Sequence, residues 1–228
     1  MSKKDSKMEE EHFAQEVEGA VLGAEQFLEK NWQKIAIGVG ALVVIFLAYV
    51  AFDKFVQTPR EAEAKNAIAK AEFYFAKDSM NLALNGDGIN SGFAYVVDEW
   101  GGTSAGNLAK YYAGVCEMKL GNYDNAISYL KDFSTKDFFI SVEKNGLIGD
   151  AYSEMGDTDK AINFYKKAYN SQNNTLSALY MKKAAQLHES KGNFDDAISL
   201  YQRIKNEYYM TSIANDIDKY ITRAEYMK

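Results

Sequence analysis

The side chains that could carry out nucleophilic or acid–base chemistry are few and far apart in the sequence. The 228 residues include two histidines, His12 and His188, and one cysteine, Cys116. A catalytic pair needs its thiol and imidazole within hydrogen-bond reach, and Cys116 and His188 fall in different copies of a repeated pattern. A lone cysteine also excludes an intrachain disulfide and a cysteine-based zinc site. We therefore expect no catalytic residue and no metal site.

Two glycine-rich segments have the composition of ligand-binding loops but not their ligands. Residues 101–106 (GGTSAG) lack the Gly-Lys-Ser/Thr ending of a phosphate-binding loop. A calcium loop that began with residues 85–90 (NGDGIN) would have Ile89 where an oxygen ligand is needed and Val96 where the terminal glutamate is needed. The sequence therefore predicts no cofactor and no small-molecule substrate.

The overall composition is that of a folded, acidic protein. Hydrophobic residues make up 47% of the chain and charged residues 25%, as in globular domains. Lys and Arg number 26 against 32 Asp and Glu, which gives a net charge of -6 and none of the basic excess that nucleic-acid binding requires. A single proline, Pro59, is typical of long, uninterrupted helices. We expect an all-α protein that does not bind nucleic acid.

An uncharged apolar segment lies near the N-terminus, at residues 35–52 (IAIGVGALVVIFLAYVAF). As a helix it would be about 27 Å long, close to the roughly 30 Å thickness of the hydrocarbon core of a bilayer. A buried core helix and a cleavable signal peptide are the alternatives. The length of the segment disfavours the first, and its late start in the chain disfavours the second. We predict an uncleaved, single transmembrane helix.

The basic residues beside this segment leave its orientation open. The N-terminal side carries Lys30 and Lys34. The C-terminal side carries Lys54, Arg60, Lys65 and Lys70. The positive-inside rule loses force for long translocated domains, so charge alone does not assign the two sides.

Residues 1–34 form an acidic, amphipathic N-terminal arm. Its eight acidic residues outnumber its five lysines, which disfavours binding to anionic lipid. An apolar stripe with helical spacing runs along it through Phe13, Val17, Ala20, Ala24 and Phe27. A helix that docks on a protein partner and a merely solvated helix both fit this pattern.

Three segments in the second half of the chain repeat one pattern. They begin at Gly114, Gly149 and Ala185, at intervals of 35 and 36 residues. The other matching columns include Gly121, Gly156 and Gly192; Asp124, Asp159 and Asp195; and Ala126, Ala161 and Ala197. The glycine permits the left-handed conformation that ends a helix, the aspartate can cap the next helix, and the small residues let two helices approach closely. The pattern predicts antiparallel helix pairs that bury their apolar faces by stacking.

This spacing of small residue, glycine and alanine, with aromatic residues between and after, resembles the tetratricopeptide repeat. The resemblance implies a repeat α-solenoid over residues 53–228. The expected segments are a degenerate first pair at 59–100, repeats at about 103–136, 138–172 and 174–208, and a closing helix at 211–226. Thr58 and Pro59 are expected to open a first helix that runs to about Leu84. The usual proline at the end of each repeat is missing.

The resemblance also implies a binding groove, because the first helices of such repeats line the concave face. The candidate groove residues are Leu108, Tyr111, Val115, Met118, Lys182 and Gln186. The first four give an apolar patch that suits a partner helix or an unfolded segment. The alternative is that the preceding helix covers this patch.

The order of elements resembles the bacterial ancillary subunit of the Sec translocon, and strings such as Phe75–Asp78, Leu84–Gly88 and Gly106–Tyr112 are similar to a branch of that family. The resemblance implies a single-pass inner-membrane protein with a cytoplasmic N-terminus and a periplasmic repeat domain. It also implies three kinds of protein partner, namely translocon subunits, a membrane-anchored periplasmic chaperone and exported clients. A structural scaffold for cell-envelope or secretion-system assembly is the alternative, because many envelope proteins combine an anchor with such repeats.

Overall fold

The computed structural model describes the backbone of residues 3–170 and 175–228, and the side chains of residues 22, 25, 27–170 and 175–228. The described residues form helices, turns and loops without a strand, as the all-α prediction requires. The chain divides into two compact units, residues 1–59 and 60–228. The predicted apolar stripe of the N-terminal arm falls largely on side chains outside the described residues.

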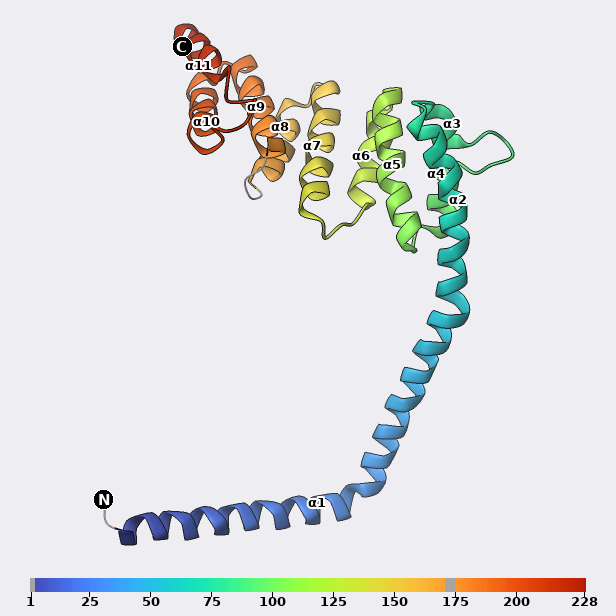
Figure 1. Cartoon of the computed structure of the whole chain (residues 1–228), viewed down its shortest axis with the longest axis vertical. Coiled ribbons are helices and arrows are strands. Elements are labelled where there is room, and N and C mark those ends of the chain that lie inside the picture. Colours follow the sequence, from blue (N-terminus) through green and yellow to red (C-terminus); the bar gives the residue numbers. More distant parts are fainter. Residues whose placement is uncertain (1–2, 171–174) are drawn as a thin grey trace. The chain divides into compact units, whose positions relative to one another are not determined.

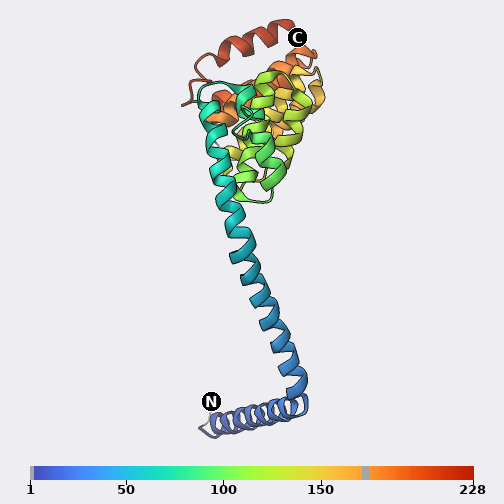
Figure 2. The ribbon, with the colours of Figure 1, turned by 90° about the vertical axis from the view of Figure 1, so that its right-hand side faces the viewer.

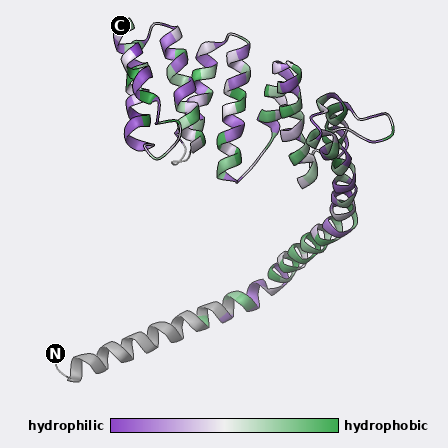
Figure 3. Ribbon diagram, turned by 45° about the horizontal axis from the view of Figure 1, so that its top comes forward, coloured by the Kyte–Doolittle hydropathy of each residue, from purple (hydrophilic) through white to green (hydrophobic). Residues whose placement is uncertain are grey.

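The first unit contains the long helix α1 (Lys3–Phe52) and a π-helical turn, η1 (Asp53–Gln57) (Figure 1). A helical run at Phe27–Ala76 is long and apolar enough to cross a membrane, with a mean hydropathy of 2.7 over 18 residues. None of that apolar window is buried, and Figure 3 shows the apolar residues in green along α1. A helix that belonged to the core of a water-soluble protein would be mostly covered.

Helix α2 (Thr58–Ala76) begins at Thr58, as predicted, but it follows η1 without a break and Thr58 is not an N-cap. Thr58 is itself helical (φ -63°, ψ -47°), and its N–H donates to the carbonyl of Asp53. Proline lacks an N–H and its ring crowds the carbonyl four residues earlier. The π-helical turn before Pro59 is the kind of local widening by which a helix continues past such a residue.

The second unit is a stack of helices in which α3 to α11 each contact the next in chain order, and α2 packs on α3 to α5 through a shared apolar cluster (Figures 1 and 2). Its helices are α2 (Thr58–Ala76), α3 (Met80–Asn85), α4 (Phe93–Trp100), α5 (Ser104–Leu120), α6 (Tyr123–Asp132), α7 (Phe138–Glu154), α8 (Thr158–Tyr169), α9 (Thr175–Ser190), α10 (Phe194–Glu207) and α11 (Ile217–Met227). Each predicted repeat contains one pair, α5–α6, α7–α8 or α9–α10.

The turn inside each pair has the predicted glycine geometry. Gly121, Gly156 and Gly192 have φ values of 80°, 79° and 76°, where a side chain would be strained. The aspartates three residues later do not cap the next helix, however. The N-cap positions are occupied by Asn122, Asp157 and Asn193. The aspartates lie in the first turn instead, where the positive end of the helix dipole stabilises a carboxylate.

The small residues of the repeat lie where two helices approach closely. A Cβ on Gly114 would meet Leu130 of α6 at 2.6 Å, and a Cβ on Gly149 would meet the Tyr165 ring of α8 at 2.5 Å. Ala126, Ala161 and Ala197 are completely buried. The prediction that these columns permit close helix packing is confirmed.

Two predicted boundaries are wrong. The expected helix from Pro59 to Leu84 is interrupted between α2 and α3, where Asp78 adopts φ 57° and the N–H of Ser79 returns to the carbonyl of Tyr74. Aspartate tolerates this left-handed conformation better than most residues. The closing helix begins at Ile217 rather than at 211, because the backbone after Tyr208 forms successive turns, the first closed by Thr211.

Candidate protein-binding surface

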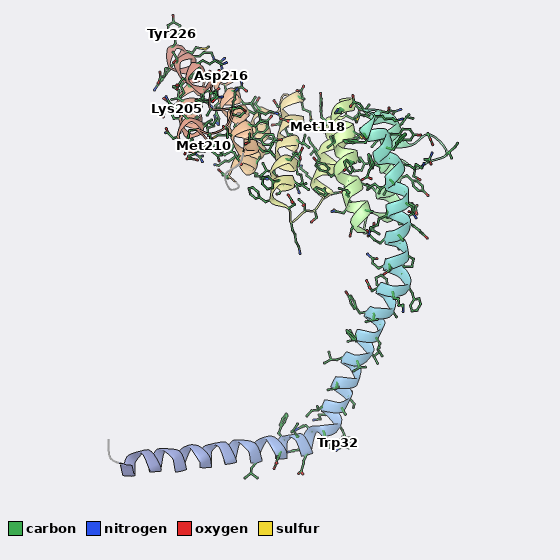
Figure 4. All side chains as sticks on the ribbon, in the orientation of Figure 1. Trp32, Met118, Lys205, Met210, Asp216 and Tyr226 are labelled. Atoms are coloured by element: carbon green, nitrogen blue, oxygen red, sulfur yellow. The ribbon has the colours of Figure 1, made fainter. Side chains whose placement is uncertain are left out.

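The four predicted groove residues of α5 are all half-buried. Leu108 packs against the core cluster built by α2 to α5. The Tyr111 ring packs 5.3 Å from that of Phe133 and is half-buried, as is Val115. Met118, near the end of α5, lines a pocket (Figure 4). Leu108, Tyr111 and Met118 thus all pack against core clusters, and of the four α5 residues Met118 lines the pocket.

The two predicted groove residues of α9 point to different places. Gln186 is exposed and lines the same pocket as Met118. The Lys182 ammonium lies 4.3 Å from the centroid of the Tyr220 ring on α11, so it faces the C-terminal helix. The structure therefore brings Met118 and Gln186 together and directs Lys182 elsewhere.

The pocket lies among four helices, α5, α7, α8 and α9, and has a volume of about 420 Å³. Its lining residues are Met118, Asp150, Ser153, Glu154, Tyr165, Lys183, Gln186 and Leu187. Met118 and Leu187 supply apolar contact, and the others supply hydroxyl, amide and charged groups. A pocket of mixed polarity on a helix stack suits a side chain or short segment of another protein.

Asp150 is the centre of the polar network in this pocket. Its carboxylate accepts a hydrogen bond of 2.7 Å from the Tyr165 hydroxyl and one of 2.6 Å from the Lys183 ammonium. These three residues come from α7, α8 and α9 in turn. Lys183 also lies 5.4 Å from the centroid of the Tyr180 ring, a cation–π distance. The charged groups of the pocket floor are thus held in place before any partner arrives.

Two glycines of α7 make room for the aromatic rings beside this network. Tyr165 and Tyr180 stack with centroids 5.9 Å apart and an interplanar angle of 18°. A Cβ on Gly146 would lie 1.9 Å from Cζ of Tyr180. A Cβ on Gly149 would likewise collide with the Tyr165 ring, at 2.5 Å. Burial raises the pKa of the Tyr165 hydroxyl well above its ordinary value, and the hydrogen bond to Asp150 raises it further. Tyr165 therefore stays a hydrogen-bond donor at physiological pH.

Sequence reasoning missed Lys183, Tyr165 and Leu187 as pocket residues. Lys183 follows Leu179 by four positions and precedes Gln186 by three, so it belongs to the same helical face. That spacing could have identified it. Tyr165 is one of the aromatic residues that follow the repeat columns, and no feature of the sequence indicates that its hydroxyl reaches the pocket.

The structure separates the two side chains considered for nucleophilic chemistry. Cys116 is buried in the cluster formed by α2 to α5, and burial followed by the nearby Glu117 carboxylate raises the pKa of its thiol to about 12. His188 on α9 lies beside Asp196, with 3.6 Å between Nδ1 and a carboxylate oxygen. A protonated, buried thiol is not a nucleophile.

Helix pairs with these small-residue columns and left-handed glycine turns define a helical-repeat protein. Comparison with protein families identifies the repeat. Tetratricopeptide-repeat models match residues 108–137, 145–175 and 181–206, so this chain carries tetratricopeptide repeats, which are protein-interaction modules. Comparison with curated proteins gives no match.

Comparison with solved structures finds one that shares the fold. A crystal structure of MamA protein is 18% identical, with a TM-score of 0.53, over 72% of this chain and 91% of that one. A second crystal structure of MamA is 20% identical, with a TM-score of 0.42, over 59% of this chain and 88% of that one. At 18% identity the likeness to the first of these structures concerns the fold alone.

Proposed function

We propose that this protein is a non-catalytic interaction module that residues 35–52 anchor in a membrane. We further propose that it serves as an ancillary subunit of the Sec translocon and assists exported proteins in the periplasm. The proposal rests on the observation that one chain combines a tetratricopeptide stack with a helix whose apolar 18-residue window is not buried at all. Such a helix avoids water only by entering lipid or a partner.

The pocket supports the part of the proposal that concerns partners. Met118 and Leu187 offer apolar contact, while Ser153 and Gln186 offer hydrogen bonds that an extended chain or a helix end can use. Translocon subunits, a membrane-anchored chaperone and emerging exported chains are the proposed partners. The proposal gives no residue a catalytic role.

The experiment that tests the translocon role is mild crosslinking in intact membranes, followed by purification of this protein. Translocon subunits should be recovered with it. Its recovery without them, under conditions that retain other accessory subunits, contradicts the proposal.

A separate experiment tests the proposed topology, with the N-terminus in the cytoplasm and the repeats in the periplasm of a bacterial inner membrane. Protease added to intact spheroplasts should degrade residues 60–228 and leave the N-terminal arm protected. Full protection of residues 60–228 would mean that the topology is reversed.

A scaffold for cell-envelope or secretion-system assembly is the second candidate. The fixed Asp150 network favours it, because groups that are already held in place select one partner geometry rather than many. Charges introduced at Tyr111 and Met118 should then abolish one specific complex and leave the binding of unfolded proteins unchanged. Loss of both kinds of binding argues against the scaffold.

A further inference from the structure

A second surface of the repeat stack gathers lysines around an aromatic pair. The rings of Tyr152 on α7 and Phe164 on α8 stack with centroids 5.5 Å apart and an interplanar angle of 29°. The Lys167 ammonium lies 4.2 Å from the Phe164 centroid, and that of Lys160 lies 5.2 Å from the Tyr152 centroid. Lys131 of α6 lies within 5.7 Å of both centroids.

These ammonium groups are held in position. Lys131 donates a hydrogen bond of 3.0 Å to the Tyr152 hydroxyl, in addition to its contact with the two rings. Lys160 and Lys167 lie four residues before and three residues after Phe164, on one face of α8. Of the cluster, Lys160 pairs with Asp157. The described side chains provide no carboxylate for Lys131 or Lys167.

A hollow of about 510 Å³ lies beside this cluster. Its described lining residues are Lys160, Asn163, Phe164, Lys166, Lys167 and Asn170, none of which is acidic. The floor is apolar, from the Phe164 ring and the lysine stems, and the rim is cationic. The asparagine amides at 163 and 170 can both donate and accept hydrogen bonds. This local excess of positive charge occurs in a chain whose net charge is -6.

We propose that this surface, formed by Lys131, Lys160, Phe164, Lys166 and Lys167, binds an acidic segment of a partner protein. The carboxylates of the segment lie against the lysines, an apolar side chain contacts Phe164, and the amides contact its backbone. A surface for anionic lipid would need apolar side chains that protrude into the bilayer, whereas Phe164 is half-buried in a hollow. This inference stands apart from the pocket at Met118 and from the translocon role.

The test is fluorescence anisotropy of the full chain in a neutral detergent, with a labelled synthetic peptide rich in Glu and containing one Phe. Wild-type protein should bind it saturably, and more weakly as sodium chloride is raised from about 50 mM to about 500 mM. The double variant Lys131→Glu/Lys167→Glu should raise Kd about tenfold or more. The matched control is Lys65→Glu/Lys70→Glu on α2, which changes the net charge equally and should alter Kd less than about twofold.

A third variant guards against a loss of folding. Lys166 is exposed and lines the hollow, so Lys166→Glu alone should weaken binding about threefold without a change in thermal unfolding. Absence of saturable binding by wild-type protein, or equal loss in the control variant, overturns the proposal. Binding of short-chain phosphatidylglycerol in place of the peptide overturns it in favour of a lipid site.

Discussion

The Tyr165 hydroxyl donates to the Asp150 carboxylate at 2.7 Å within one repeat, and the same carboxylate accepts from Lys183 of α9 in the next repeat. The following repeat uses the same arrangement. Tyr201 occupies the position that corresponds to Tyr165 and donates at 2.6 Å to Glu189, which pairs with Arg223 of α11. In each case the tyrosine holds a carboxylate of its own repeat, and that carboxylate pairs with a basic residue of the element that follows.

Removal of the Tyr165 hydroxyl should weaken the stack. Tyr165→Phe keeps the ring but leaves a half-buried carboxylate with one donor fewer, and we expect a loss of about 1 to 2 kcal/mol in the free energy of unfolding. Urea denaturation followed by circular dichroism measures it. Tyr226→Phe, at a side chain that is 93% exposed, is the control and should change nothing. Equal losses in the two variants would show that the hydrogen bond to Asp150 has no special role.

A methyl group at Gly146 should be costly for a steric reason. Its Cβ would lie 1.9 Å from Cζ of Tyr180, so the ring must move out of its stack with Tyr165. We expect Gly146→Ala to lose about 1 to 3 kcal/mol of unfolding free energy, as overpacked cores do, although alanine favours a helix. Gly102→Ala meets nothing within 4 Å and should be neutral in the same assay. Neutral behaviour of Gly146→Ala would refute this account of α7.

The Glu189–Arg223 pair should make stability depend on pH. Burial alone would raise the pKa of Glu189, but the hydrogen bonds from Arg223 and Tyr201 outweigh it and lower that pKa. A pKa that is lower in the folded state than in the unfolded state stabilises the fold at pH values above the unfolded-state pKa of Glu, about 4.3. This stabilisation is lost as the pH falls through the folded-state pKa.

Urea midpoints at about pH 5 and about pH 3 measure this effect. The wild-type midpoint should fall more over this interval than that of Arg223→Met, in which burial is left to raise the pKa of Glu189. Arg203→Met removes an equal charge from the exposed pair with Glu207 and should keep the wild-type dependence. The same pH dependence in all three proteins would contradict the role given to Arg223.

Sequence reasoning predicted the features of the fold that depend on local backbone sterics. The left-handed turn at Gly121 and the close approach at Gly114 follow from the absence of a Cβ, and both are confirmed. It placed the helix caps wrongly, because Asp124 and Asn122 are both plausible caps and only the backbone geometry distinguishes them. The interruption at Asp78 was missed for a similar reason, since no glycine or proline marks it.

The candidate site was predicted only in part, because its polar network depends on contacts between helices. Met118 and Gln186 were predicted from the resemblance to the tetratricopeptide repeat, whose first helices line the concave face, and both line the pocket. The bond from Tyr165 to Asp150 joins two helices of one repeat, and the bond from Lys183 to Asp150 joins two repeats. Such pairs depend on how far each helix is rotated and shifted along its neighbour, which the single sequence does not encode at any one position.

Cys116 should be inert in the folded protein. Its side chain is completely buried, and a thiol pKa of about 12 leaves very little thiolate at pH 8. We expect iodoacetamide to alkylate it about a hundredfold more slowly in native protein than in urea. The control is the double variant Cys116→Ser/Ser128→Cys, because Ser128 is exposed. Its thiol should react at similar rates in native protein and in urea. Rapid modification of native Cys116 would show that the cluster formed by α2 to α5 opens readily.

Met118 gives the most direct test of the pocket, because it supplies apolar contact beside acidic groups. Met118→Glu would place a third carboxylate near Asp150 and Glu154, so it should repel a partner that uses the apolar wall and lower crosslinked complex about tenfold. Met155→Glu, at a side chain that is 43% exposed at the end of α7, introduces the same charge outside this pocket and should leave the complex intact. Thermal unfolding of both variants checks that the stack remains folded. Unchanged crosslinking of a folded Met118→Glu protein would move the partner site away from α5, and loss in both variants would indicate a general charge effect.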